Sequence, residues 1–317
     1  YLAKRERKKI DVAVEVADGS LSIEDSRTRR TWQVENLQVD FALPSDRSLP
    51  VELTAAGMLA GAQRGGGFEA AMRIQQDRSV GDAAADPPAG EPQGQETESA
   101  GPDSISLKAE GLSLAVFEPV VRRVLPGTRL AGRLTADLQC KWDSRRPDGR
   151  AKLQAKATAE DMQLSGPMLG KDQPALKRLQ AEGLVAWERG LVQFDRITAE
   201  SDLGTLSLSG AVDLTGQGRA AARHGYELKG QLDLVRLAAL LPDTLRIQKD
   251  TQVTSGRAQV SYSSRPGREG MTWNGRLEVT DLTASSGARR VVWRQPVLID
   301  LSARETAEGP VIENLKC

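Results

Sequence analysis

The chain has 317 residues with a formal net charge of zero, 39% hydrophobic residues and only 4% aromatic residues. This composition disfavours one large globular core, and the scattered Lys and Arg residues do not form the basic stripe that would make a nucleic acid an expected partner. Only two cysteines, Cys140 and Cys317, and one histidine, His224, are present, so neither a disulfide framework nor a multi-histidine metal site is expected.

The first predicted unit, residues 1–77, is an N-terminal β segment. Its period-two pattern of apolar residues begins at Val12 and resumes at Leu21 after Asp18-Gly19, which predicts a hairpin at that dipeptide. The same alternation predicts further strands over 32–34, 37–43 and 51–55. One face of each strand is mostly apolar and the other mostly polar.

The second predicted unit, residues 78–104, is a disordered acidic linker or insertion. It is rich in Ala, Gly, Pro, Glu and Gln and contains almost nothing able to bury apolar surface. We therefore expect it to separate the N-terminal β segment from the rest of the chain and to be the first site of proteolysis.

The remainder of the chain contains an internal repeat with an offset of about 120 residues. The first copy reads Leu107-Lys-Ala-Glu-Gly-Leu-Ser-Leu, then an apolar segment ending in Leu125-Pro126, then Gly132-Arg-Leu. The second copy has the same order of parts, namely Leu228-Lys-Gly-Gln-Leu-Asp-Leu, Leu241-Pro242 and Gly256-Arg-Ala. The sequence thus predicts one β repeat over 105–225 and a second, incomplete one over 226–317.

One short helix is predicted in each repeat, over 117–125 and 234–241. Apolar residues recur there at i, i+3, i+4 and i+7, and a proline follows each pattern. The simplest interpretation is a helix lying against the sheet or closing its end. A slightly basic outer face leaves a membrane-surface or partner-docking helix open as an alternative.

No catalytic motif is present. The chain lacks GxSxG, P-loop, HExxH and GxGxxG patterns, and His224 lies in a predicted loop. The acidic residues Glu160, Asp161 and Asp281 occur at equivalent places of the repeat, which favours turn or outward-facing positions over a pair of catalytic carboxylates. We expect no enzymatic activity, no catalytic residue, no metal site and no cofactor.

Several sequence segments resemble those of a known family. Val16-Ala-Asp-Gly-Ser-Leu-Ser-Ile-Glu-Asp25, Trp32-Gln-Val-Glu-Asn-Leu-Gln-Val39 and Leu203-Gly-Thr-Leu-Ser-Leu-Ser-Gly-Ala-Val-Asp-Leu214 resemble the AsmA-like family of the TamB and YhdP type. The resemblance implies a large envelope protein of diderm bacteria, anchored in the inner membrane, whose curled sheet forms an apolar trough for phospholipid acyl chains or supports outer-membrane assembly. A periplasmic location is then expected, with the membrane anchor and the contacts to inner or outer membrane in segments outside this chain.

The strand pattern supports the same architecture. Two short helices are too few to cover the apolar face of so many strands, so the sheet must close, pack as a sandwich, or curl around something apolar. We expect a mainly β, elongated and repetitive curled antiparallel sheet that forms a groove, with two short helices, and phospholipid acyl chains as partners. The alternatives are a non-lipid scaffold or assembly factor and a β-sandwich adhesin array.

The predicted lining of this groove is the set of apolar residues at alternating strand positions. They are Val12, Val14, Val16, Leu134, Leu138, Leu206, Leu208, Val212, Val260, Tyr262, Val297, Ile299 and Leu301.

Overall fold

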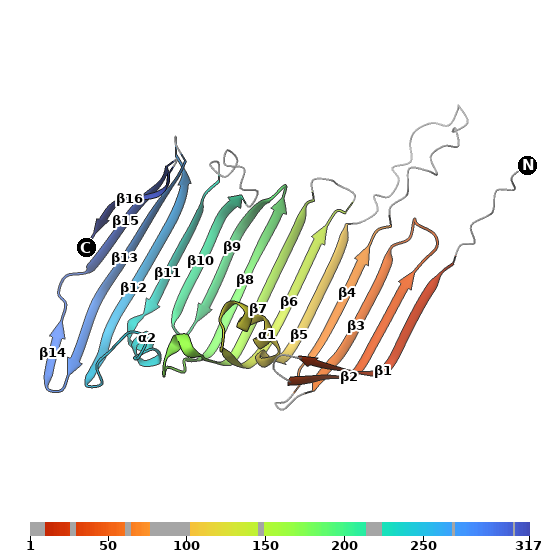
Figure 1. Ribbon diagram of the computed structural model, residues 1–317, viewed down its shortest axis with the longest axis horizontal. Coiled ribbons are helices and arrows are strands. Elements are labelled where there is room, and N and C mark those ends of the chain that lie inside the picture. Colours follow the sequence, from red (N-terminus) through yellow and green to blue (C-terminus); the bar gives the residue numbers. More distant parts are fainter. Residues whose placement is uncertain are drawn as a thin grey trace, which may run out of the picture.

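The computed structural model describes residues 10–25, 30–60, 65–76, 102–144, 149–213, 224–267, 270–306 and 308–317. Their strands form one long, open, curled antiparallel sheet of 16 strands, which lie side by side in chain order (Figure 1). Only β14 departs from this order, because it pairs with β13 beside β15. The expected fold class is confirmed, and the sandwich alternative is wrong for the described part of the chain.

Most strands are long. Their bounds are β1 Val12–Asp25, β2 Arg30–Leu43, β3 Val51–Ala60, β4 Gly67–Ile74, β5 Asp103–Ser113, β6 Arg129–Trp142, β7 Ala151–Ser165, β8 Ala175–Glu188, β9 Leu191–Ser201, β10 Gly204–Asp213, β11 Tyr226–Asp233, β12 Thr251–Pro266, β13 Met271–Ser286, β14 Arg289–Val292, β15 Val297–Thr306 and β16 Gly309–Lys316. Of the predicted insertion over 78–104, residues 78–101 lie outside the described residues. The strand β5 begins at Asp103, two residues before the predicted start of the repeat.

The hairpin predicted at Asp18-Gly19 is wrong, because β1 runs through this dipeptide as one strand. Asp18 has a φ of 55°, and the pairing register with β2 shifts on either side of Gly19. This is a β-bulge, in which one extra residue in the left-handed conformation, tolerated by Asp and Asn, bends the strand without reversing it. Asn36, with a φ of 51°, likewise joins the predicted strands 32–34 and 37–43 into β2. Beyond these bulges, β1 and β2 turn across the sheet toward α1 (Figure 1).

The two short helices occupy equivalent places. The strand β5 leads through a 3-10 turn, Leu114–Phe117, into α1, Glu118–Val124, whereas β11 leads directly into α2, Leu234–Leu240. Both lie along the border of the sheet that is formed by the lower ends of the strands in Figure 1, and this border is called here the helix edge. The acidic residues Asp161 and Asp281 have φ values of 50° and 54° within β7 and β13, so they form matching bulges six strands apart.

Few hydrophobic side chains are buried. Nine hydrophobic residues among those described are buried, and five of them are alanines, whereas 25 large hydrophobic residues are exposed. The one buried cluster, Ala109, Leu112 and Ala136, lies on β5 and β6 and packs against Leu59. A second layer of secondary structure would bury many more large side chains. The described chain is therefore a single layer with a thin local core beside α1.

Two buried carboxylates accept hydrogen bonds from backbone N–H groups in the connections between strands. Asp103, only 2% exposed, accepts hydrogen bonds from the backbone N–H groups of Gln75 at 2.6 Å and Ser144 at 2.9 Å. Gln75 follows β4, Ser144 follows β6, and Asp103 itself begins β5, so the hydrogen bonds of one side chain connect the ends of three neighbouring strands. At the helix edge, Asp172 accepts from the N–H groups of Asp243 at 3.0 Å and Thr244 at 2.7 Å, and thereby links the connection between β7 and β8 to the segment after α2.

The link through Asp172 predicts a pH-dependent stability. Burial acts to raise the pKa of Asp172, but the hydrogen bonds donated by Thr244 and Asp243 outweigh it and hold the pKa below its ordinary value. A depressed carboxylate pKa stabilises the fold above the unfolded-state pKa, and this contribution disappears as the pH falls through the folded-state value. Urea unfolding of the chain and of Asp172→Asn should thus differ most at neutral pH and converge under strongly acidic conditions. A difference that grows on acidification would contradict this.

Candidate functional site

The cross-strand pairing joins apolar residues of the whole sheet into one row, called here the floor row. Residues paired directly opposite each other in an antiparallel sheet project from the same face. Read strand by strand from β1 to β16, the row is Val16, Val39, Ala55, Ala70, Leu107, Leu138, Ala155, Gly183, Ile197, Leu208, Leu228, Tyr262, Gly275, Leu301 and Leu315. No charged or strongly polar side chain interrupts it.

A single irregular step occurs in the floor row, between β8 and β9, where the pairing register shifts after Glu182. A Cβ atom on Gly183 would lie 2.8 Å from Cγ1 of Ile197, so the Ile197 side chain occupies the space above the glycine. The absence of a side chain at Gly183 allows this close approach. The apolar surface therefore continues across the bulge.

A second row, beside the first, has smaller side chains at its centre. Five alanines lie opposite one another on β5 to β9: Ala109, Ala136, Ala157, Ala181 and Ala199. The row continues on β10 to β15 through Leu206, Gly230, Val260, Leu277 and Ile299. Larger residues flank the alanines, among them Leu107 and Leu138 on one side and Leu112 and Leu134 on the other. On β5 and β6 the alanine row is thus a low strip between two higher ones, whereas on β7 and β8 the floor row beside it has only Ala155 and Gly183.

All thirteen residues predicted to line the groove lie on this apolar face. Val16, Leu138, Leu208, Tyr262 and Leu301 belong to the floor row, Leu206, Val260 and Ile299 belong to the second row, and Val12, Val14, Leu134, Val212 and Val297 lie in neighbouring rows of the same face. Sequence reasoning did not include the apolar partners on β2, β4, β8 and β9, such as Phe41, Phe68, Val185 and Phe194. They follow the same alternation, but bulges at Asn36 and Arg196 break its phase.

The side chains of the apolar face pack against their lateral neighbours but remain open to solvent. Val14 is 48% exposed and Leu206 is 44% exposed. Tyr226 and Tyr262 lie with ring centroids 5.9 Å apart, and burial, with the nearby Tyr226, raises the pKa of Tyr262. A continuous face of partly exposed Val and Leu side chains that crosses the sheet marks an interaction surface.

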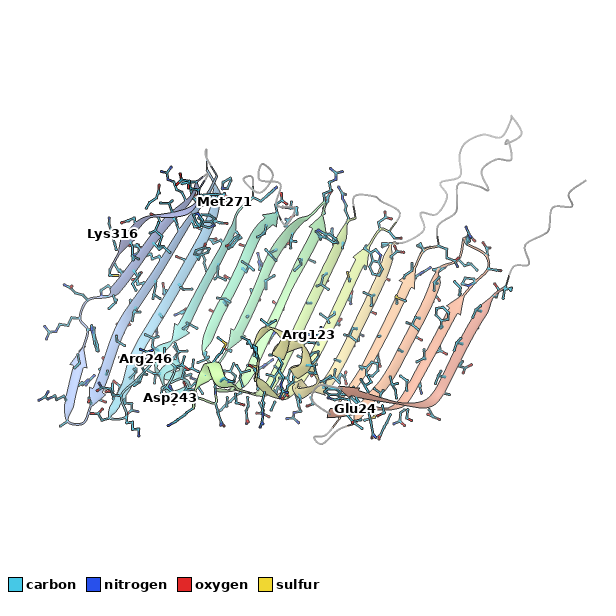
Figure 2. The ribbon with its side chains drawn as sticks, viewed as in Figure 1. Glu24, Arg123, Asp243, Arg246, Met271 and Lys316 are labelled. Carbon is cyan, nitrogen blue, oxygen red and sulfur yellow. The ribbon has the colours of Figure 1, made fainter. Side chains whose placement is uncertain are left out.

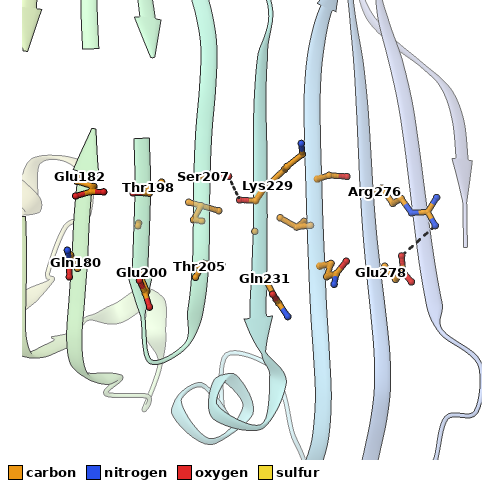
Figure 3. A pocket seen from close by; sticks show the side chains of 16 residues that line it. Gln180, Glu182, Thr198, Glu200, Thr205, Ser207, Lys229, Gln231, Arg276 and Glu278 are labelled. Carbon is orange, nitrogen blue, oxygen red and sulfur yellow. Dashed lines mark hydrogen bonds and ion pairs between the residues drawn. The ribbon is translucent and has the colours of Figure 1, made fainter. Parts of the chain in front are cut away.

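The opposite face is polar. It carries a ladder of alternating charge across β4 to β8, formed by Glu69, Lys108, Asp137, Lys156 and Glu182, each directly opposite the next. This face has a shallow hollow of about 640 Å³, and Figure 3 shows Glu182, Glu200, Lys229 and Arg276 among its lining residues. Removing charged side chains from water costs free energy, so this face is the one in contact with solvent.

The helix edge overhangs one side of the apolar face. The Cδ1 atom of Leu234 in α2 and that of Leu282 both approach within 3.2 Å of the position of a Cβ on Gly256, so α2 packs on the apolar face of β12. Near α1, a hollow of about 530 Å³ opens between strand ends that are distant in the sequence. Its lining includes Trp32 and Leu59 together with Val116, Leu130 and Leu164.

The described residues contain no group of three or more His, Cys, Asp or Glu side chains placed to hold a metal ion. Within the same part of the chain, no helix has the length and apolar character needed to cross a membrane.

Comparison with protein-family models, with curated proteins and with solved structures finds no match for this chain.

Proposed function

We propose that the apolar face binds the acyl chains of phospholipids and that this sheet is a lipid-conducting segment of a large cell-envelope protein. The observation that supports this most directly is the unbroken floor row, which crosses every strand of the sheet from β1 to β16 except β14. At about 4.8 Å between strands, it extends for roughly 70 Å. An acyl chain lying along the row meets an apolar or tyrosine side chain on every strand of the row except β8 and β13, where Gly183 and Gly275 lie.

The energetics suit sliding as well as binding. Covering roughly 200 Å² of apolar surface with one acyl chain contributes about 5 kcal/mol. Because neighbouring stretches of the row are chemically alike, this free energy changes little as the chain moves from one strand to the next. The sheet then holds a lipid without trapping it at one place.

The proposed setting is the periplasm of a diderm bacterium, as the resemblance to the AsmA-like family implies. In this setting the polar face, with its charge ladder from Glu69 to Glu182, is in contact with water, and the lipid replaces the missing second layer on the other face.

Site-specific photo-crosslinking in cells tests the proposal. A photoreactive amino acid at Leu208 or Leu301, both in the floor row, should yield phospholipid adducts by mass spectrometry. The matched control is Ser207, the neighbour of Leu208 on the same strand, whose side chain is on the polar face opposite Thr198 and Lys229. It should yield none.

Two results would overturn the proposal. Equal lipid labelling at Leu208 and Ser207 would show that the label reports bulk membrane. Adducts at Leu208 with polypeptide alone would show that the apolar face is covered by protein, as in a scaffold or assembly factor.

A further inference from the structure

We infer that the helix edge is a docking surface for an anionic membrane, distinct from the apolar face. This edge is the side of the sheet that carries α1, α2 and β14 (Figure 1). Its described connecting segments are 114–128, 166–174, 202–203, 234–250 and 287–296. From β5 to β13 they extend over roughly 40 Å.

Large hydrophobic side chains project from this edge into solvent. Val120 and Val124 lie one turn apart on α1 and are 62% and 79% exposed, and Met168 is 73% exposed. The other exposed hydrophobic residues of these segments are Phe117, Leu245, Val291, Val292 and Trp293. These exposed residues come from four different connections, so they do not belong to the margin of one local hydrophobic core. Exposed Val, Met and Trp side chains at the rim of an element are typical of insertion into the interfacial layer of a bilayer.

The charge of the edge complements an anionic surface. The five segments contain nine Arg and Lys residues but only five Asp and Glu residues. Four of these carboxylates are already engaged. Glu118 pairs with Arg122 at 3.0 Å and Asp202 with Arg236 at 3.4 Å, while Asp172 accepts backbone N–H groups and Asp250 accepts from the Ser286 hydroxyl at 2.8 Å.

Several cations of the edge remain available for lipid headgroups. No carboxylate of the described residues pairs with Arg123, Arg246, Lys249, Arg289 or Arg290, and all five side chains are exposed. Figure 2 shows Arg246 at this end of the sheet and Arg123 on α1. Interleaved basic and apolar side chains, rather than either kind alone, distinguish a lipid surface from a purely charged or purely apolar partner. The occupant is therefore a bilayer that contains anionic phospholipid.

Flotation of the 317-residue protein with vesicles tests the inference. The protein should float with vesicles of phosphatidylglycerol and phosphatidylcholine in equal amounts and not with phosphatidylcholine alone, and high salt should weaken the binding. Replacing Arg246, Lys249, Arg289 and Arg290 together by Gln should lower the vesicle partition coefficient by about six hundredfold, because each of the four cations near an anionic surface contributes about a fivefold factor.

The matched control removes four exposed lysines from the polar face, Lys108, Lys141, Lys152 and Lys156, also as Gln. This variant should float almost as well as the parent protein. Equal weakening in both variants would show non-specific charge attraction and would overturn the inference, as would unchanged flotation of the edge variant.

A second measurement tests insertion of the apolar side chains. In a C140S/C317S background, an environment-sensitive fluorophore on Val124→Cys should shift to shorter wavelength on the anionic vesicles, and the same fluorophore on Ser209→Cys, on the polar face, should not. No shift at residue 124 would overturn the inference. The four substitutions Arg246→Gln, Lys249→Gln, Arg289→Gln and Arg290→Gln lie at the helix edge and leave the apolar face unchanged. Loss of vesicle docking by that variant with intact lipid adducts at Leu208 therefore separates this inference from the proposed function.

Discussion

Leu208→Asp is expected to abolish the lipid that the protein carries while leaving the protein folded. Leu208 lies in the floor row opposite Ile197 and Leu228. An acyl chain bound over residue 208 would cover the new carboxylate and remove it from water without giving it a hydrogen-bond partner, which costs several kcal/mol. Each 1.4 kcal/mol lowers the affinity for the lipid about tenfold. Without lipid the carboxylate is exposed on an open face, so the free energy of unfolding should change little.

The measurement is phospholipid per mole of purified protein, by mass spectrometry, together with urea unfolding. Ser207→Asp is the control, because the new carboxylate lies on the polar face opposite Lys229. It should retain the lipid. A Leu208→Asp protein that keeps its lipid would contradict the acyl-chain proposal, and one that unfolds would show that a protein layer covers Leu208.

Asp103→Ala is expected to give the largest loss of stability, about 3 kcal/mol. The substitution leaves the N–H groups of Gln75 and Ser144 without the carboxylate that now accepts from them at 2.6 Å and 2.9 Å. Because these residues follow β4 and β6, the ends of three strands lose their common attachment. The urea midpoint should fall with little change in slope.

Two further variants make the Asp103 prediction specific. Asp103→Asn retains one acceptor oxygen and should lose less stability than Asp103→Ala. Asp137→Ala removes an exposed carboxylate from the charge ladder of the polar face, opposite Lys108 and Lys156, and should change the free energy of unfolding by about 0.5 kcal/mol or less. A loss for Asp103→Ala no greater than that of Asp137→Ala would show that the buried hydrogen bonds do not hold these strands.

The alternation of apolar and polar residues by itself determined that the chain is mainly β and which residues share a face. This worked because the period of two is a local property of an extended backbone, independent of the partner strand. The helical spacing at Val120 and Leu237 is equally local, and both short helices were predicted for that reason. The groove residues chosen on this basis, from Val12 to Leu301, all lie on one face of the sheet.

Only the tertiary structure decided how those faces join. The sequence pattern allowed a sandwich, a closed barrel or a curled sheet, since each buries the same alternating residues. The floor row depends on pairing between residues far apart, such as Ala70 with Leu107, and one step of register would move such a partner to the other face. The bulges at Asp18 and Asn36 were misread for a related reason. An Asp-Gly or Asn position allows a left-handed residue, but whether that residue reverses the chain or bends it within a strand is set by the neighbouring strand that continues the hydrogen bonds.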